Sequence, residues 1–218
     1  MSRKPARLQK GRRELNKEDK LRRITGAARA LFVTKGYDET STREIATKAD
    51  VAQATLFLYA SDKRDLLFLT VNDELELASY RAREAIRSEA SFLDNLSAAL
   101  GIVYDFLGKE RELARLVLRE MTFYEDGAQG KRFSQTRQRM ISLCSEIARI
   151  AQEKGEIGTA HDAQRIGAVI FGIYQIEIRK WLAEPPAPVS EGLRALREVL
   201  EILVTGLSPN SKPSRLRT

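Results

Sequence analysis

Residues 40–63 read TSTREIATKADVAQATLFLYASDK. Apolar residues recur at helical spacing, which predicts one short helix through about Ala49 and a second from about Gln53 to Tyr59, with a break at Asp50. The Thr-Ser-Thr at the start of the stretch offers side chains that cap a helix well. Two short helices around a tight turn indicate a helix-turn-helix, which enters the major groove of DNA, although the same pattern also occurs as a plain packing corner.

The spacing inside this stretch suits the motif. Ala46 is small enough to let a second helix approach, and Val51 follows the turn, where an apolar side chain can hold the crossing of the two helices. Leu56 and Tyr59 can face inward. The residues then presented to the edges of the bases are Gln53, Ala54 and Thr55. A glutamine can pair with adenine, and an alanine or threonine methyl can touch the methyl group of thymine.

The distribution of charge along the sequence indicates that the N-terminal part binds a polyanion. The net charge is +7 and lies entirely in residues 1–66, which hold 16 Lys and Arg against 9 Asp and Glu. Six of the first 13 residues are basic and none is acidic. Such an arm attracts phosphates because binding releases counterions, and it is also what a solubilising tail looks like. Thr42 and Lys63 stand at predicted helix starts, which suit phosphate.

Composition and periodicity predict an all-α chain. Gly (13) and Pro (6) are too sparse for a sandwich or barrel with many turns. Asn16 and Asp19 approximate a capping box for a first helix that ends at Gly36. The expected organisation is a disordered basic arm over 1–15, a helix-turn-helix domain over 16–62, a helical ligand-binding and dimerisation domain over 63–207 and a flexible tail over 208–218.

The second part of the chain is expected to be a helical bundle. Further helices are predicted at 92–107, 110–124, 131–154, 162–183 and 190–206. The last two are apolar on more than one face or along a sustained stripe, so each must be buried on more than one side. They can close the core of one monomer or pair with the same two helices of a second copy, and we expect the homodimer.

Aromatic and methionine residues collect on the middle helices. This composition suits an apolar pocket for a small molecule, and it is also what an ordinary core looks like. The candidate pocket residues are Tyr104, Met121, Phe123, Tyr124, Met140, Phe171, Tyr174 and Trp181. Glu177, Arg179 and Lys180 lie close by and can meet a polar group of a ligand or face solvent.

The sequence gives little indication of a metal site, a catalytic site or a membrane span. His161 is the only histidine, and no cysteine or carboxylate cluster at metal-binding spacing accompanies it. No Gly-rich phosphate loop, GxSxG or HExxH occurs, so we expect no catalytic residue, no metal and no cofactor. The lone Cys144 excludes an internal disulfide and fits a reducing cytoplasm. No apolar run is long enough to span a bilayer, so we expect a cytoplasmic protein.

Residues 24–67, ITGAARALFVTKGYDETSTREIATKADVAQATLFLYASDKRDLL, resemble the DNA-binding domain of the TetR family of bacterial transcriptional regulators. The matching pattern is Ala-Ala-x-x-Leu-Phe, then Gly-Tyr, Thr-Ser/Thr, an Ile-Ala pair and a Val after the turn. Thr-Leu then precedes an aromatic pair, and a Lys-x-x-Leu-Leu-like segment closes the domain. The rest of the chain resembles the family only loosely.

The resemblance implies a homodimer that reads a palindromic operator in double-stranded DNA and responds to a small molecule, with repression as the family's usual effect. It also implies backbone or base contacts for particular residues. These residues are Thr42, Arg43, Gln53, Ala54, Thr55, Phe57, Tyr59 and Lys63. The basic arm would follow the neighbouring minor groove or backbone.

Three positions depart from the family pattern. Asp50 stands where Gly is usual and would have to adopt a left-handed conformation. Ala52 replaces the usual Ser cap, and Phe57 replaces a Tyr whose hydroxyl could bond a phosphate. The alternatives left open are an activator or ligand-independent regulator of the same fold, a helical protein-interaction module and an enzyme on a helical scaffold. The basic arm favours DNA over a protein partner.

Overall fold

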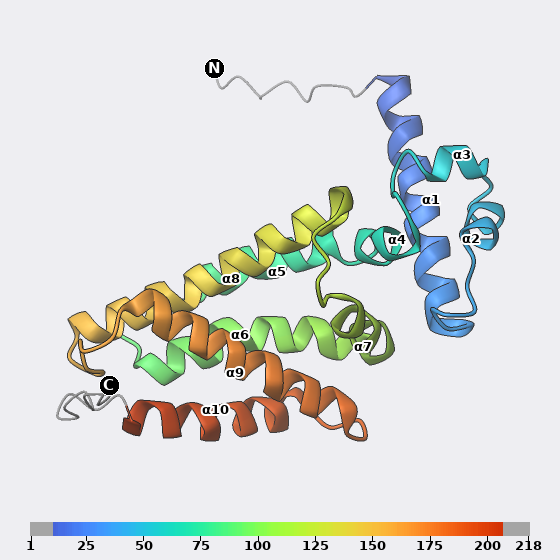
Figure 1. Cartoon of the computed structure of the whole chain (residues 1–218). Coiled ribbons are helices and arrows are strands. Elements are labelled where there is room, and N and C mark those ends of the chain that lie inside the picture. The colour runs from blue at the N-terminus through green and yellow to red at the C-terminus, as the bar shows by residue number, and fades with distance from the viewer. Residues whose placement is uncertain (1–10, 207–218) are drawn as a thin grey trace, which may run out of the picture. The chain divides into compact units, whose positions relative to one another are not determined.

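The computed structural model describes residues 11–206, in which ten α-helices and no strand occur (Figure 1). The all-α prediction is therefore confirmed. The helices are α1 (Arg12–Thr34), α2 (Thr42–Lys48), α3 (Gln53–Leu56), α4 (Lys63–Leu69), α5 (Asn72–Glu84), α6 (Phe92–Lys109), α7 (Arg111–Glu120), α8 (Gly127–Glu153), α9 (Ala163–Ala183) and α10 (Val189–Gly206).

The described chain forms two compact units. The first holds the residues up to Thr70 together with Gly127–Gln129, and the second holds Val71–Asp126 and the residues from Gly130 onward. The sequence prediction ended the first domain at residue 62. The first unit extends past that point because α4 packs on α1. The functions expected of the two domains stay predictions.

The first helix begins earlier than predicted. Gly11 is extended, with φ −65° and ψ 154°, and its carbonyl accepts hydrogen bonds from the amides of Glu14 and Leu15 at 2.9 and 3.2 Å. Arg12 is already helical, because the residues that follow Gly11 are mostly good helix formers. Asn16 is therefore inside α1 and is not its cap. Residues 1–10 of the expected arm and the expected tail 208–218 lie outside the described residues.

In the first unit, α2 and α4 pack on α1, and α3 packs on α2 (Figure 1). The core between them is made of small and branched apolar side chains. Its fully or nearly fully buried members include Ile24, Ala28, Phe32, Ile45, Ala46 and Leu56. Short helices of this kind can bury only one face each, so the opposite faces of α2 and α3 stay exposed to solvent.

The second unit is a bundle of long helices in which α9 lies between α8 and α10 (Figure 1). Its helices follow the predicted ranges closely, except that α8 begins at Gly127 and a separate helix α5 precedes α6. Gly167 on α9 lies against α8: a Cβ added there would stand 2.4 Å from the backbone nitrogen of Ser145. Because Gly167 has no side chain, the backbones of α8 and α9 come into direct contact.

Candidate nucleic-acid interface and ligand cavity

A capping box starts α2. The hydroxyl of Ser41 accepts a hydrogen bond from the amide of Glu44 at 3.2 Å, and the Glu44 carboxylate accepts one from the Ser41 amide at 2.9 Å. The Lys35 ammonium also binds this carboxylate. This ammonium and the Ser41 donors lower the pKa of Glu44 from 4.5 to about 2. The beginning of the helix-turn-helix is therefore held by contacts among residues close in sequence.

The turn between α2 and α3 has the left-handed backbone conformation that was predicted for Asp50. Asp50 has a φ of 51°, the left-handed region that Gly usually occupies. The Arg23 guanidinium donates to the carbonyl oxygens of Ala49 and Asp50 at 2.9 and 3.1 Å and to the Asp50 carboxylate at 3.1 Å. The sequence did not indicate this role for Arg23, because no local pattern connects two positions so far apart in the chain.

Helix α3 is anchored by one residue and exposes the others. Leu56 is fully buried, whereas Gln53 and Ala54 are exposed and Thr55 is half-buried. Ala52 precedes the helix in an extended conformation without a side-chain cap, as its alanine side chain predicts. The start of α3 therefore presents its predicted base-reading residues to solvent.

Two of the predicted contact residues meet across the turn. The Gln53 amide donates to the Thr42 hydroxyl at 3.4 Å, so the starts of α2 and α3 lie next to each other. Arg43 is exposed beside them. A glutamine, a hydroxyl and a guanidinium on one surface are the kinds of group that read base edges and phosphates in a major groove.

Apolar side chains continue this surface beyond α3. Phe57 is 45% exposed and Leu58 is 82% exposed. Leu58 was not among the predicted contact residues, although a leucine outside the apolar face of a predicted helix could have indicated it. Tyr59 is half-buried, and its hydroxyl donates to the carbonyl oxygen of Lys17 at 3.3 Å, so it connects the end of α3 to α1.

Lys63 has a structural role that the sequence did not indicate. Its ammonium donates to the carbonyl oxygens of Tyr37 and Asp38 at 2.9 and 3.1 Å and stands 4.6 Å from the centre of the Tyr37 ring. Two of its three N–H donors thus bind the loop after α1. The predicted phosphate contact would have to use the third.

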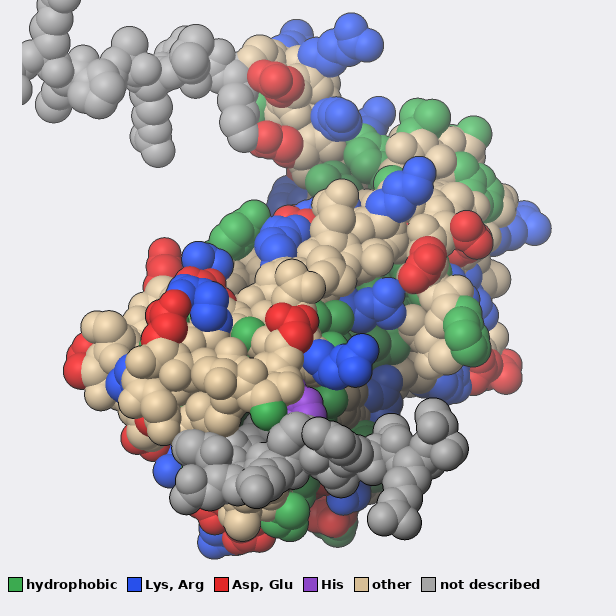
Figure 2. All heavy atoms as spheres, turned by 60° about the vertical axis from the view of Figure 1, so that its left-hand side comes forward, with side chains coloured by type: hydrophobic (Ala, Val, Ile, Leu, Met, Phe, Trp, Pro, Cys, Tyr) green, Lys and Arg blue, Asp and Glu red, His purple; other side chains and the backbone are tan. Residues whose placement is uncertain are grey.

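Where the described chain begins, Lys and Arg side chains alternate with Asp and Glu side chains (Figure 2).

A small cavity of about 50 Å³ lies among the helices of the second unit. Four of the predicted pocket residues line it: Met121, Met140, Phe171 and Tyr174. The other lining residues are Leu75, Val103, Leu107, Val117, Leu118, Phe133, Thr136, Arg137 and Gln175. Most of these side chains are apolar. Burial raises the pKa of Tyr174 well above its usual value, so its hydroxyl stays protonated.

The remaining predicted pocket residues lie elsewhere. Phe123 is 95% exposed, because the chain turns with a φ of 53° at this residue after α7 ends. Its assignment to a pocket is wrong. Tyr104 and Trp181 are buried against each other, with ring centres 5.3 Å apart, and Tyr124 is buried beside Gly130. These three belong to the packed core and do not line the cavity.

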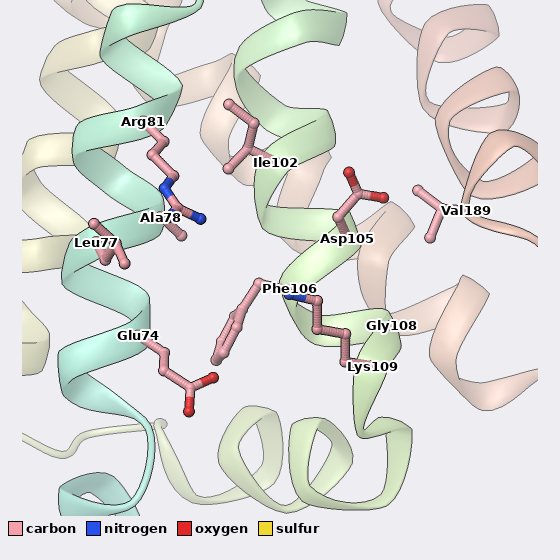
Figure 3. A pocket seen from close by; sticks show the side chains of 10 residues that line it. All are labelled: Glu74, Leu77, Ala78, Arg81, Ile102, Asp105, Phe106, Gly108, Lys109 and Val189. Atoms are coloured by element: carbon pink, nitrogen blue, oxygen red, sulfur yellow. The ribbon is translucent and has the colours of Figure 1, made fainter.

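An open groove of about 650 Å³ runs along the outside of α5 and α6 (Figure 3). Arg81 on α5 and Phe106 on α6 reach into the space between the two helices (Figure 3). Four charged side chains border an apolar floor: Glu74, Arg81, Asp105 and Lys109. The groove therefore mixes charges of both signs, whereas the interior cavity is mainly apolar.

Within the described residues, no group of three or more His, Cys, Asp and Glu side chains could hold a metal ion. His161 is exposed. Cys144 is buried, and its burial raises the pKa of the thiol to about 12, so it is not a reactive thiolate at neutral pH. No helix between residues 11 and 206 is both long enough and apolar enough to cross a membrane.

Comparison with known proteins identifies the first unit. Residues 24–69 match the family model described as bacterial regulatory proteins, tetR family. The helix-turn-helix domain over these residues is therefore of the TetR type. The chain is a DNA-binding transcriptional regulator, as the helix-turn-helix predicted. TetR-family regulators bind operator DNA, act as dimers and bind small-molecule effectors, which confirms the predicted kinds of partner at the level of the family.

Two curated relatives come from Bacillus subtilis. The uncharacterized HTH-type transcriptional regulator YvkB is 27% identical over 156 residues, covering 70% of this chain and 80% of the relative. The fatty acid metabolism regulator protein is 23% identical over 193 residues, covering 88% of this chain and 97% of the relative. These named relatives are transcriptional regulators.

Solved structures share the fold over most of the chain. FadR from Bacillus subtilis in complex with stearoyl-CoA superposes with a TM-score of 0.66 at 21% identity, covering 85% of this chain and 98% of that one. FadR from Thermus thermophilus, a repressor solved with lauroyl-CoA, gives a TM-score of 0.63 at 22% identity, covering 89% and 98%. The likeness establishes the all-helical fold of both units.

Proposed function

We propose that this TetR-family protein is a cytoplasmic repressor that binds a palindromic operator as a homodimer and is released by a small effector held inside the second unit. The observation that carries the DNA-binding part is the exposure of Gln53 and Ala54 on a helix anchored by the fully buried Leu56. Each copy would place α3 in one major groove, and the two half-sites would lie roughly 34–36 Å apart.

The outer surface of the last two helices supports the homodimer. Val169 and Ile176 on α9 are 45% and 57% exposed, and Ile202 on α10 is 73% exposed. Gly172 lies between them on α9 and Ala168 precedes Val169, and both of these small residues are exposed. An apolar surface with small residues lets helices of a second copy approach closely, and a two-fold axis would bury the same residues on both copies.

The interior cavity supports an apolar effector. Its walls are mainly apolar, and the FadR proteins of similar fold are complexes with stearoyl-CoA and lauroyl-CoA. At about 50 Å³ the cavity is far below the roughly 300–1,000 Å³ of a drug-sized site. An effector would therefore have to move adaptable side chains such as Met121 and Met140. A ligand that binds only the expanded bundle shifts the protein toward that state.

One relative favours an alternative effect on transcription. The activator FasR of Mycolicibacterium smegmatis is 25% identical over 103 residues, covering 47% of this chain and 47% of the relative. An activator would use the same α3 surface and the same dimer. Repression is preferred because the Thermus thermophilus protein, which matches over most of both chains, is a repressor.

The test is selection of binding sites from random duplex DNA by the purified protein. The wild-type protein should select a palindromic motif. Gln53→Ala should relax one base position in each half-site, at a cost of about 1–3 kcal/mol for the lost base contact. Gln138→Ala, an exposed glutamine on α8, is the control and should leave the motif unchanged. If no motif emerges, sequence-specific binding through α3 is wrong.

A further inference from the structure

Two residues of α1 contact the chain on both sides of α3. Before α3, the Arg23 guanidinium binds the carbonyl oxygens of Ala49 and Asp50, which are 26 and 27 residues further along the chain. After α3, the Tyr59 hydroxyl donates to the carbonyl oxygen of Lys17 at 3.3 Å. Lys17 and Arg23 are about 9 Å apart along α1, because each residue of an α-helix rises about 1.5 Å. One short stretch of α1 therefore meets both ends of the segment that carries α3.

Arg23 binds the backbone at the point where α2 ends. Carbonyl groups at the end of a helix lack the amide of a following turn and need another donor. One terminal nitrogen of Arg23, Nη1, lies 2.9 Å from the carbonyl oxygen of Ala49, the C-cap residue of α2, and 3.1 Å from that of Asp50. A cation at this end is also attracted by the partial negative charge of the helix terminus. Arg23 thus stabilises the left-handed turn at Asp50 from outside the turn.

Asp19 sets the direction of the Arg23 guanidinium. Its carboxylate accepts a hydrogen bond from Nε of Arg23 at 3.1 Å, one helical turn earlier on α1. The ion pair between Arg23 and Asp50 contributes less than the carbonyl contacts, because the Asp50 side chain is 98% exposed and exposed pairs are weak. We call Asp19, Arg23 and the Lys17 carbonyl group the α1 clamp.

The α1 clamp bears on the direction of Gln53 because α3 is too short to fix its own axis. A helix of four residues is not stable by itself, so its direction depends on Leu56 and on the contacts at its two ends. Gln53 begins α3 only three residues after Asp50. Hydrogen bonds to base edges require close distances and good alignment. A small rotation of α3 would therefore remove base contacts and leave most phosphate contacts in place.

We propose that Arg23 is a positioning residue for DNA recognition: through the α1 clamp it holds α3 in the orientation that distinguishes the operator from other DNA, without contacting DNA itself. This rests on the proposed function, because it takes α3 as the helix that reads bases. The competing role for Arg23 is a direct phosphate contact, since guanidinium groups also bind phosphate. The two roles differ in their effects on specific and non-specific binding.

The test measures the affinity of the full-length protein for the motif that the wild type selects and for a scrambled duplex of the same length, at several salt concentrations. Arg23→Gln should lower the ratio of the two affinities by about tenfold, the size of one lost base contact. It should leave the affinity for the scrambled duplex within about twofold and the salt dependence unchanged, because no phosphate contact is lost. Hydrogen exchange of the α1 and α4 amides shows that each variant is folded.

Arg22→Gln is the matched control. Arg22 is the neighbouring arginine, it also binds Asp19, and its side chain is 78% exposed. The substitution removes the same charge and leaves the bonds to the turn intact, so the affinity ratio should stay at the wild-type value.

Two further variants separate positioning from charge. Arg23→Lys keeps the charge and loses the planar fork that reaches the Asp19 carboxylate and the turn together. It is a milder change than Arg23→Gln, and it should still lower the affinity ratio, whereas a phosphate contact would survive it. In an Asp50→Gly background the turn adopts its positive φ without strain, so Arg23→Gln should lower the ratio less there than in the wild type.

The outcomes distinguish failure of this role from failure of the proposed function. Equal losses for both duplexes together with a weaker salt dependence would make Arg23 a phosphate contact and overturn the positioning role. An unchanged ratio in folded Arg23→Gln would show that the α1 clamp does not orient α3. In both cases the reading of bases by α3 stands. If the wild type selects no motif at all, base reading by α3 is wrong, and the role of Arg23 fails with it.

Discussion

Helix α3 in the first unit and helix α9 in the second are held in place in opposite ways. α3 has four residues, of which only Leu56 is buried, and its position depends on the turn and caps around it. α9 has 21 residues, of which nine are buried, and its position depends on direct contact with α8 and α10. The difference shows how one chain combines an exposed surface for reading DNA with a cavity lined mainly by apolar side chains.

The largest expected effect is on the close contact of α9. Gly167→Ala places a Cβ 2.4 Å from the Ser145 nitrogen and 2.6 Å from its Cα, and neither backbone atom can move without shifting α8. We expect a loss of about 3 kcal/mol in the free energy of unfolding of the second unit. Urea unfolding followed by the fluorescence of Trp181, the only tryptophan, reports on this unit.

Gly26→Ala is the matched control for this prediction. Gly26 is also in a helix, but nothing lies within 4 Å of the added Cβ. The substitution should stabilise α1 by about 1 kcal/mol at most, because alanine is the better helix former. Unchanged stability of Gly167→Ala would contradict the close packing of α8 on α9.

The next prediction concerns Leu56, the only buried residue of α3. Leu56→Ala should destabilise the first unit by about 3 kcal/mol, because it opens a cavity under a helix with no other buried residue. Hydrogen exchange of the amides of α2 and α3 measures this loss directly. Operator binding should weaken in parallel, because α3 would no longer be held.

Leu58→Ala is the control, because Leu58 is 82% exposed. It should change the stability of the first unit by no more than about 0.5 kcal/mol. Equal protection of α3 in the two variants would mean that Leu56 is not its anchor. A weaker operator affinity for Leu58→Ala with unchanged exchange would add Leu58 to the DNA-contacting surface.

The smallest expected effect is the pH dependence of α2. The Lys35 ammonium first, and then the Ser41 donors, hold the pKa of Glu44 at about 2, below its usual 4.5. A lowered pKa means that the ionised form stabilises the fold. This stabilisation is present above pH about 4.5 and is lost as the pH falls toward about 2.

Glu44→Gln isolates this contribution. The variant should expose the amides of α2 to faster exchange at neutral pH than the wild type, and the difference between the two proteins should shrink as the pH is lowered from 4.5 toward 2. Other carboxylates titrate in both proteins and cancel in the comparison. A difference that is independent of pH would show that the Glu44 charge does not hold the start of α2.

The first unit could be predicted in most of its features. Ser41 as cap, Ala46 and Leu56 as buried residues and Asp50 in a left-handed turn all follow from residue types at short spacing. Two features could not be predicted. Arg23 holds the turn, and Lys63 binds carbonyl groups of the loop after α1. Both contacts join residues far apart in the chain, where no local pattern exists.

The candidate cavity could be predicted only in outline. Aromatic and methionine residues indicated a pocket in the bundle, and four of the eight candidates line it. Phe123 was misplaced because its direction depends on a positive φ at the end of α7. Arg137 and Gln175 were missed because they are separated by a whole helix–loop–helix, and only the packing of α8 on α9 brings them together.

Helix periodicity, caps and the turn are local properties, so the amino-acid sequence alone determines that the chain is all-helical and carries a helix-turn-helix. Burial and direction of side chains in a bundle depend on which helices meet and at what distance. The contact between Gly167 and Ser145 sets that distance for α8 and α9. The tertiary structure therefore decides which side chains line the cavity, because helix packing joins residues that are remote in the sequence.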